Sequence, residues 1–222
     1  MISPLTIPPT PTNDAEASAH FERWAFLSHE AGALQGVRGT YSRIVQAYET
    51  PPRTYHNLGH VAFCLAVFDL VSDLAADPMA VEFAIWFHDA IYDSKLKNNE
   101  EMSAAFALES LGAMGIGTDL QATVHSLILL TKHDTSPETV DGGIIIDVDL
   151  AILGADRETY DRYERAIRDE YSWLSDDEYR NGRRTFLEGM LARKRIYHTE
   201  RLAELGEEEA RKNMQRAVDS MV

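Results

Sequence analysis

The sequence contains a single cysteine, Cys64, and no long apolar run. One thiol excludes a disulfide framework or a cysteine-rich zinc site within the chain, and it favours a reducing compartment. No stretch approaches the roughly 18 apolar residues that a membrane span needs. Residues 1–12 contain four prolines but neither a basic region nor an apolar core, so they do not resemble a secretory signal. We therefore expect a cytoplasmic protein.

Positive charge is also scarce. The chain has 21 lysines and arginines against 36 acidic residues, which gives a formal net charge of -15. This negative excess repels long polyanions, so we expect neither a long nucleic acid nor a membrane surface as a partner. A small phosphorylated substrate is not excluded, because a bound cation dominates the electrostatic field at its own site.

Several common catalytic signatures are missing. The sequence has no GxxxxGK[ST] phosphate loop and no GxSxG nucleophile elbow. Gly115 and Gly117 lack the third glycine of a dinucleotide-binding fingerprint. These absences argue against a nucleotide-driven motor, a Rossmann-type enzyme and a serine hydrolase.

What the sequence does contain is apolar residues at helical spacing along most of its 222 residues. We predict an all-α fold, in which residues 1–13 form a flexible arm, Asn13 caps the first helix, and residues 14–222 form one helical domain. Residues 79–91 are apolar on nearly all sides and predict a central buried helix. The segment GGIIIDVD is ambiguous between helix and strand. The other expected helices include residues 24–31, 41–48, 63–74, 102–114, 120–131, 144–153, 160–168, 179–197 and 207–218.

Histidines and aspartates interrupt this apolar pattern at points where burial would be unfavourable without partners. His56 and His60 stand four residues apart at the expected start of a helix, a spacing that can present two imidazoles to one centre. His88 and Asp89 lie near the end of the predicted central helix, and an aspartate pair lies inside the apolar run IIIDVDLAIL. Imidazoles together with carboxylates suit Mn, Fe, Co, Ni or Zn, with Mg as an alternative.

Three sequence blocks, RTYHNLGHVAFCL, AIWFHDAIYD and IIDVDLAILG, resemble the HD superfamily of metal-dependent phosphohydrolases. The YHNxxH element is similar to one in cyclic nucleotide phosphodiesterases, and NNEEMSA, LILLTKHD and IRDEY resemble a bacterial group of predicted HD phosphohydrolases. The resemblance covers residues 53–153. It implies four metal ligands and a general acid, His56. The implied ligands are His60, His88, Asp89 and Asp149.

The resemblance favours Asp149 over Asp147 as the last ligand, because an aliphatic residue usually follows that ligand and continues the helix. Asp147 is then expected to cap a helix or to support the ligands. A second metal ion would need His125 and His133, which stand eight residues apart on one expected helix. In that case Asp89 is the ligand best placed to bridge the two ions.

Further candidates surround this set. Asp93 and Glu100 are expected either to orient the attacking water or to be solvated loop charges. Arg53 and Lys132 could hold a phosphate near the metal, and His133 is expected to contact the phosphate or to support a ligand. Cys64 is expected to be a small core residue.

The expected function is hydrolysis of a phosphate ester or anhydride of a nucleotide or another small phosphorylated metabolite. A metal-bound hydroxide is the expected nucleophile, and protonated His56 is the expected proton donor to the departing oxygen. Two alternatives stay open: a non-catalytic regulatory module that binds a metal or a nucleotide, and a di-iron oxygenase. The amphipathic C-terminal segments leave a homodimer open as well.

Overall fold

The computed structural model describes residues 14–49 and 53–221, and every regular element within these ranges is a helix. The all-α prediction is therefore confirmed. The predicted arm, including Asn13, lies outside the described residues. The elements are α1 (Asp14–Glu30), α2 (Val37–Tyr48), α3 (Leu58–Asp69), η1 (Ser72–Leu74), α4 (Pro78–Phe87), α5 (Asn99–Met114), α6 (Thr118–Leu130), α7 (Val140–Leu150), η2 (Ala151–Gly154), α8 (Arg157–Glu170), α9 (Asp176–Ala192) and α10 (Glu200–Ser220).

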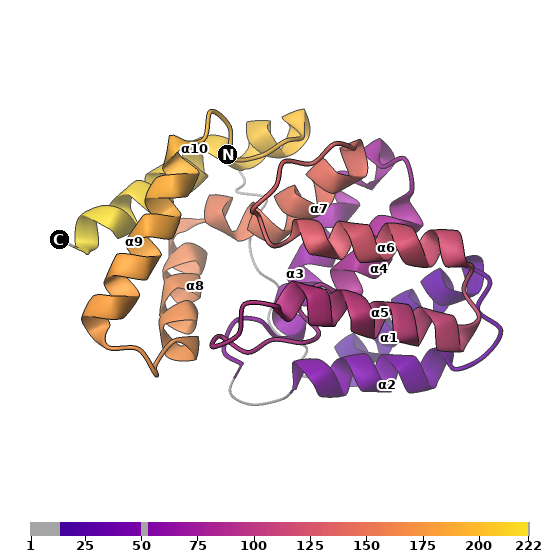
Figure 1. The fold of residues 1–222 in the computed structure, drawn as a ribbon. Coiled ribbons are helices and arrows are strands. Elements are labelled where there is room, and N and C mark those ends of the chain that lie inside the picture. The colour runs from indigo at the N-terminus through magenta and orange to yellow at the C-terminus, as the bar shows by residue number, and fades with distance from the viewer. Residues whose placement is uncertain (1–13, 50–52, 222) are drawn as a thin grey trace.

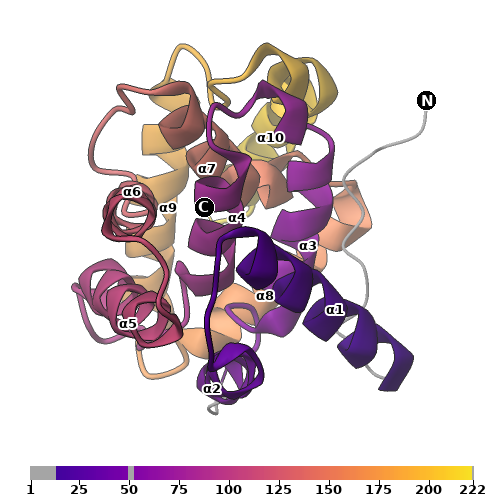
Figure 2. The same ribbon diagram turned by 90° about the vertical axis from the view of Figure 1, so that its right-hand side faces the viewer.

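Helix α4 lies at the centre of the molecule, as its apolar sequence predicted. It packs against α3, α5, α6 and α7, and Figure 2 shows these helices around it. Asp77 caps the helix by accepting a hydrogen bond from the backbone of Ala80, and Pro78 occupies a first-turn position that needs no N–H donor. The aromatic residues at its far end, Trp86 and Phe87, are completely buried.

The predicted extension of this central helix to residue 91 is wrong, because α4 ends at Phe87. In the residues that follow, polar side chains from other segments form hydrogen bonds with the backbone. The Arg53 guanidinium donates to the carbonyl of Asp89 and to that of the next residue, both at 2.9 Å, and the Asp89 N–H donates to the Tyr48 hydroxyl at 3.2 Å. These partners are distant in sequence, so local periodicity cannot reveal them.

Helix α3 begins and ends earlier than its apolar pattern predicted. Asn57 is its N-cap, and the Asn57 side chain accepts a hydrogen bond from the backbone of Gly59. His56 therefore precedes the helix, whereas His60 lies in its first turn. The chain leaves α3 at Asp69 and forms the short helix η1 before α4.

The ambiguous segment GGIIIDVD is helical and belongs to α7, where Thr139 caps the first turn. Helix α6 ends at Leu130, so His125 lies on this helix and His133 lies beyond it. The expectation that these two histidines share one helix is therefore wrong.

The last three helices gather on one side of the molecule, away from α1, α2, α5 and α6 (Figure 1). Ser175 and Glu178 form a capping box at the start of α9, and Thr199 caps α10. One cluster of buried apolar side chains joins all ten α-helices, from Trp24 on α1 to Val218 on α10. Among the helices of the described ranges, none combines the length and the apolar character of a membrane span.

Candidate functional site

Four side chains from three helical elements converge near the middle of the molecule. His60 comes from α3, His88 and Asp89 from the turn after α4, and Asp149 from the last turn of α7. The His60 Nε2 atom lies 3.1 Å from both His88 Nε2 and Asp149 Oδ1. Asp89 Oδ2 lies 3.1 Å from His88 Nε2 and 3.6 Å from His60 Nε2. The structure thus brings together the four residues that the sequence resemblance implied as ligands.

These separations fit a shared metal ion. Donor atoms held about 2.1 Å from one ion stand roughly 3.0–3.4 Å apart in octahedral or tetrahedral geometry. The His88 Nδ1 atom donates to the Ile85 carbonyl at 2.9 Å, which directs Nε2 toward the other donors. Asp89 and Asp149 retain 13% and 16% exposure of their side chains, so an ion could reach both carboxylates.

Cys64 also lies beside this centre. The donor atoms of His60, Cys64, His88 and Asp149 all lie within 4.8 Å of one another, so this buried group could bind a metal ion. The Cys64 Sγ atom is 3.7 Å from both ring nitrogens of His60, and it therefore lies alongside the imidazole rather than at its Nε2 tip. Burial also raises the pKa of the thiol well above its usual value. Asp89 is the more acidic donor of the two, and its Oδ2 atom lies 3.1 Å from the Nε2 atom of His88.

The charges at this centre are strongly coupled. Burial lowers the pKa of His60. Burial also tends to lower the pKa of His88, but Asp89 and Asp149 outweigh it and raise that pKa well above its usual value. Burial opposes ionisation of the two carboxyl groups, yet the neighbouring histidines hold the pKa of each below its usual range. The electrostatics therefore favour the ionised form of both carboxyl groups, which is the form that binds a cation.

His56 lies next to the centre and is held by a buried glutamate. Glu170, near the C-terminal end of α8, accepts hydrogen bonds from the backbone of Tyr55 and His56 at 2.7 and 3.0 Å, and its other oxygen lies 2.5 Å from His56 Nδ1. The Tyr92 ring stacks on the imidazole with centroids 3.9 Å apart. Burial tends to lower the pKa of His56, but the charges of Asp89 and Glu170 raise it overall.

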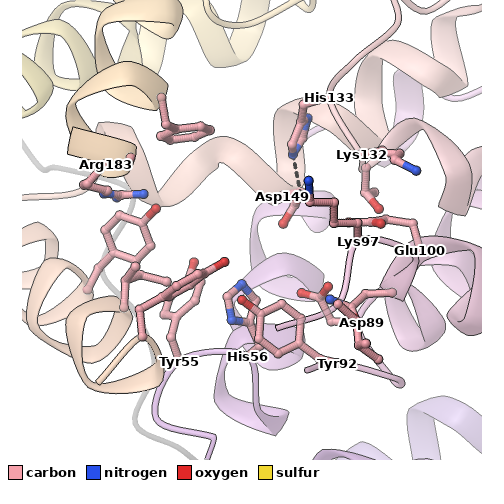
Figure 3. Close-up of a pocket in the computed structure, with 18 of the residues that line it drawn as sticks. Tyr55, His56, Asp89, Tyr92, Lys97, Glu100, Lys132, His133, Asp149 and Arg183 are labelled. Atoms are coloured by element: carbon pink, nitrogen blue, oxygen red, sulfur yellow. Dashed lines mark hydrogen bonds and ion pairs between the residues drawn. The ribbon is translucent and has the colours of Figure 1, made fainter. Parts of the chain in front are cut away.

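His133 reaches the centre from the turn after α6. Its Nε2 atom lies 2.8 Å from Asp149 Oδ2, on the carboxylate oxygen that does not contact His60 (Figure 3). The backbone of His133 is left-handed, with φ of 59°, and Arg193 donates to its carbonyl at 3.2 Å. This uncommon conformation turns the ring toward Asp149.

A cavity of about 540 Å³ opens above these residues. His56, Asp89, His133 and Asp149 line one end of it, and side chains of α8, of α9 and of the loop between these helices line the other. Figure 3 shows Lys97 reaching into the cavity beside Asp149, while Arg183 lies on the opposite side. The volume falls within the range of about 300–1,000 Å³ typical of small-molecule sites.

The residues expected to hold a phosphate have different environments. Arg53 does not line the cavity, because its guanidinium is engaged with the backbone carbonyls of His56 and Asp89 and of the residue after Asp89. Lys132 does line the cavity, but its ammonium group forms an ion pair with Glu101 on the outside.

The two acidic residues expected to orient water also differ. Glu100 lines the cavity, and burial together with the charge of Asp89 raises its pKa. Asp93 does not line the cavity, and its side chain accepts a hydrogen bond from the backbone of Lys95 at 2.9 Å. Only Glu100 of this pair is in position to contact a molecule in the cavity.

Asp147 and His125 lie away from the centre. Asp147 is completely buried and accepts hydrogen bonds at 2.6 Å from the backbone of both His198 and Thr199, so it joins α7 to the start of α10. Burial raises its pKa despite these two donors. His125 does not line the cavity. A second ion site would need both His125 and His133, but of these two histidines only His133 lies at this centre.

Sequence reasoning missed Glu170, Tyr92 and Lys97. Glu170 lies in the block IRDEY, which contributed to the family resemblance, but one glutamate on a charged helix has no local sign of burial. Tyr92 directly follows the apolar segment 79–91, beyond the end of α4, and Lys97 lies in a polar loop. Their relation to His56 and Asp149 depends on helix packing, which a single sequence does not display.

No family model, no curated protein and no solved structure matches this chain. The geometry of the described residues and the sequence motifs are therefore the features from which a function can be inferred.

Proposed function

We propose that this chain is a metal-dependent phosphohydrolase of the HD type, which cleaves a phosphate ester or anhydride of a small metabolite. The observation that carries the proposal is the convergence of two imidazoles and two carboxylates with donor separations of 3.1–3.6 Å. The two carboxylates of this group, Asp89 and Asp149, line a cavity that is also lined by His56, which is hydrogen-bonded to Glu170. Such a combination supplies both a cation site and a proton donor.

The proposed ligands are His60, His88, Asp89 and Asp149. Their mixed nitrogen and oxygen donors suit Mn, Fe, Co, Ni or Zn, with Mg as an alternative. A divalent ion bound there would lower the pKa of a coordinated water and offset negative charge on the phosphoryl oxygens. His133 supports this centre, since its bond to Asp149 orients the carboxylate.

His56 is the proposed general acid. The hydrogen bond to Glu170 occupies Nδ1, which leaves the Nε2 proton of the imidazolium for the departing oxygen of the substrate. Glu170 acts as a positioning residue, because it fixes both the ring and the backbone of His56. Stacking on Tyr92 restricts rotation of the imidazole further.

Arg53 also acts through its neighbours in this proposal. Its three hydrogen bonds hold the His56 backbone and the turn that contains Asp89. Lys97 replaces it as the proposed phosphate contact at the metal end, because Lys97 lines the cavity and forms no ion pair with a described residue. Glu100 is the candidate for orienting water.

The test is metal-dependent hydrolysis by the purified full-length chain. Mn²⁺, Co²⁺ or Ni²⁺ should support turnover of a generic phosphodiester, phosphomonoester or pyrophosphate, and His88→Ala should abolish it together with metal binding. His125→Ala is a matched control, because it makes the same substitution at a histidine that does not line the cavity. Activity that survives His88→Ala would refute the proposal. Nucleotide binding without any turnover would instead favour a regulatory module.

A further inference from the structure

The two ends of the cavity differ in chemistry. The metal end is lined by His56, by Lys97 and by the carboxylates of the proposed ligands Asp89 and Asp149. The outer end is formed by α8, α9 and the loop between them, which together contribute a wall of aromatic and aliphatic side chains, called here the α8–α9 wall. The wall includes Tyr163, Ile167, Tyr171, Leu174, Tyr179 and Phe186. These helices lie beyond residues 53–153, the segment that carries the metal-site motifs.

The two arginine side chains at the outer end, Arg168 and Arg183, are each paired with a carboxylate. The Arg183 guanidinium lies 2.7 Å from a Glu164 carboxylate oxygen, and its centre stands 5.0 Å from the ring centroids of both Tyr163 and Phe186. Arg168, which lies over the Tyr179 ring, is paired with Asp176 at 2.7 Å. A second phosphoryl group at this end would therefore meet aromatic rings and occupied arginines.

The aromatic wall has surface available to a ligand. Tyr171 and Phe186 are only partly buried and line the cavity, so part of each side chain faces the space inside it. Flat apolar groups bind such rings by stacking, and every nucleobase offers a suitable face. Sugars and short polyols carry many hydroxyl groups and have less flat apolar surface, so they would cover less of the wall.

We infer that the cavity takes a phosphomonoester with one phosphoryl group at the metal end and a flat, uncharged ring system against the α8–α9 wall. This inference rests on the proposed function and narrows its substrate class. Lys97 contacts the phosphoryl group, and Phe186 and Tyr171 contact the ring system. The group esterified to the phosphate determines which substrates bind tightly, because the wall offers stacking surface but no unpaired positive charge.

The experiment compares the binding of three probes by calorimetry to the Mn²⁺-loaded full-length chain carrying His56→Gln, which removes the proposed proton donor so that the esters are not turned over during the titration. AMP and ribose 5-phosphate share the same phosphoester and differ in the base, whereas fructose 1,6-bisphosphate has a second phosphoryl group at its far end. AMP should bind roughly 5- to 100-fold more tightly than ribose 5-phosphate. The bisphosphate should bind no more tightly than ribose 5-phosphate.

Two variants assign the selectivity to the wall. Phe186→Leu and Tyr171→Leu should each reduce the preference for AMP at least about threefold, and Phe186→Leu should leave ribose 5-phosphate binding unchanged. Phe26→Leu is the matched control, since Phe26 is 70% exposed on α1 and does not line the cavity. Circular dichroism melting of each variant shows whether it folds, and the ratio of two affinities is insensitive to the fraction folded.

Failure of this inference can be distinguished from failure of the proposed function. Equal affinity for AMP and ribose 5-phosphate, an absence of AMP binding, or tightest binding of the bisphosphate would overturn the substrate class. If His88-dependent hydrolysis persists in any of these cases, the phosphohydrolase proposal stands. If AMP is preferred but no ester is hydrolysed, the substrate inference survives as a binding preference and the catalytic proposal fails.

Discussion

The metal end of the cavity and its α8–α9 wall are built on different physical principles. At the proposed metal end, imidazoles and carboxylates from α3, α7 and the turn after α4 are largely buried, with nitrogen-to-oxygen distances of 3.1–3.6 Å. In the wall, aromatic rings surround arginines that already have carboxylate partners. Removing one charge from the first region leaves another buried charge unpaired, which is costly. The wall can change its shape with smaller effects, so we expect it to govern selectivity and the metal end to govern chemistry.

The largest effect is expected from Asp149→Asn. This change keeps the side-chain shape but removes the charge that His60 and His133 share. Metal affinity and kcat/KM should both fall more than about 100-fold. Equilibrium dialysis with Mn²⁺ and steady-state kinetics measure the two losses. A variant that keeps wild-type metal content would exclude Asp149 as a ligand and would break the contrast between the two regions.

The neighbouring substitution Asp147→Asn should affect folding instead of metal binding. The amide retains one acceptor but turns a donor toward the backbone N–H groups of His198 and Thr199. We expect a loss of about 2–3 kcal/mol in the free energy of unfolding. Urea titration measures this loss, and metal content per folded molecule should stay unchanged. Loss of metal from fully folded protein would contradict the assignment of Asp147 to the α7–α10 junction.

Glu170→Gln tests the link between the two regions, because this glutamate of α8 holds His56. The negative charge of Glu170 helps to raise the pKa of His56, and a raised pKa keeps the imidazolium protonated to higher pH. Without that charge, the basic limb of the kcat/KM profile should move about one pH unit downward. Activity near pH 8 should fall about tenfold.

Two controls sharpen this test. Glu170→Asp keeps the charge and should leave the basic limb close to its wild-type position. Glu188→Gln removes an exposed charge from α9, outside the cavity, and should leave the profile unchanged. An unshifted basic limb in Glu170→Gln would show that His56 is not the titrating proton donor.

The smallest effect is expected from Lys132→Ala. Its ammonium pairs with Glu101 on an exposed surface, and such pairs contribute little. We expect KM to change less than about threefold, whereas Lys97→Ala should raise KM about tenfold. Lys194→Ala, an exposed lysine outside the cavity, serves as the control. A larger effect from Lys132 than from Lys97 would restore the phosphate role that the sequence suggested for Lys132.

Helix boundaries show where sequence reasoning succeeded and where it failed. The apolar spacing predicted the helical class and the buried position of α4, because both depend on interactions between residues three or four apart. The end of α4 was predicted wrongly because Arg53 and Tyr48, which are distant in sequence, bind the backbone of the next turn. Histidine spacing likewise misplaced His133, since the chain leaves α6 before reaching it.

By itself, the sequence determined the residue types that could bind a metal ion here, since imidazoles and carboxylates inside apolar segments need partners when they are buried. It also determined the helical framework, through periodicity that acts over a single turn. Only the tertiary structure decided which partner each group received. Glu170 meets His56, Asp147 turns to the start of α10, and Arg53 is engaged with backbone carbonyls. These pairings join residues up to 114 positions apart, and they depend on how complete helices pack.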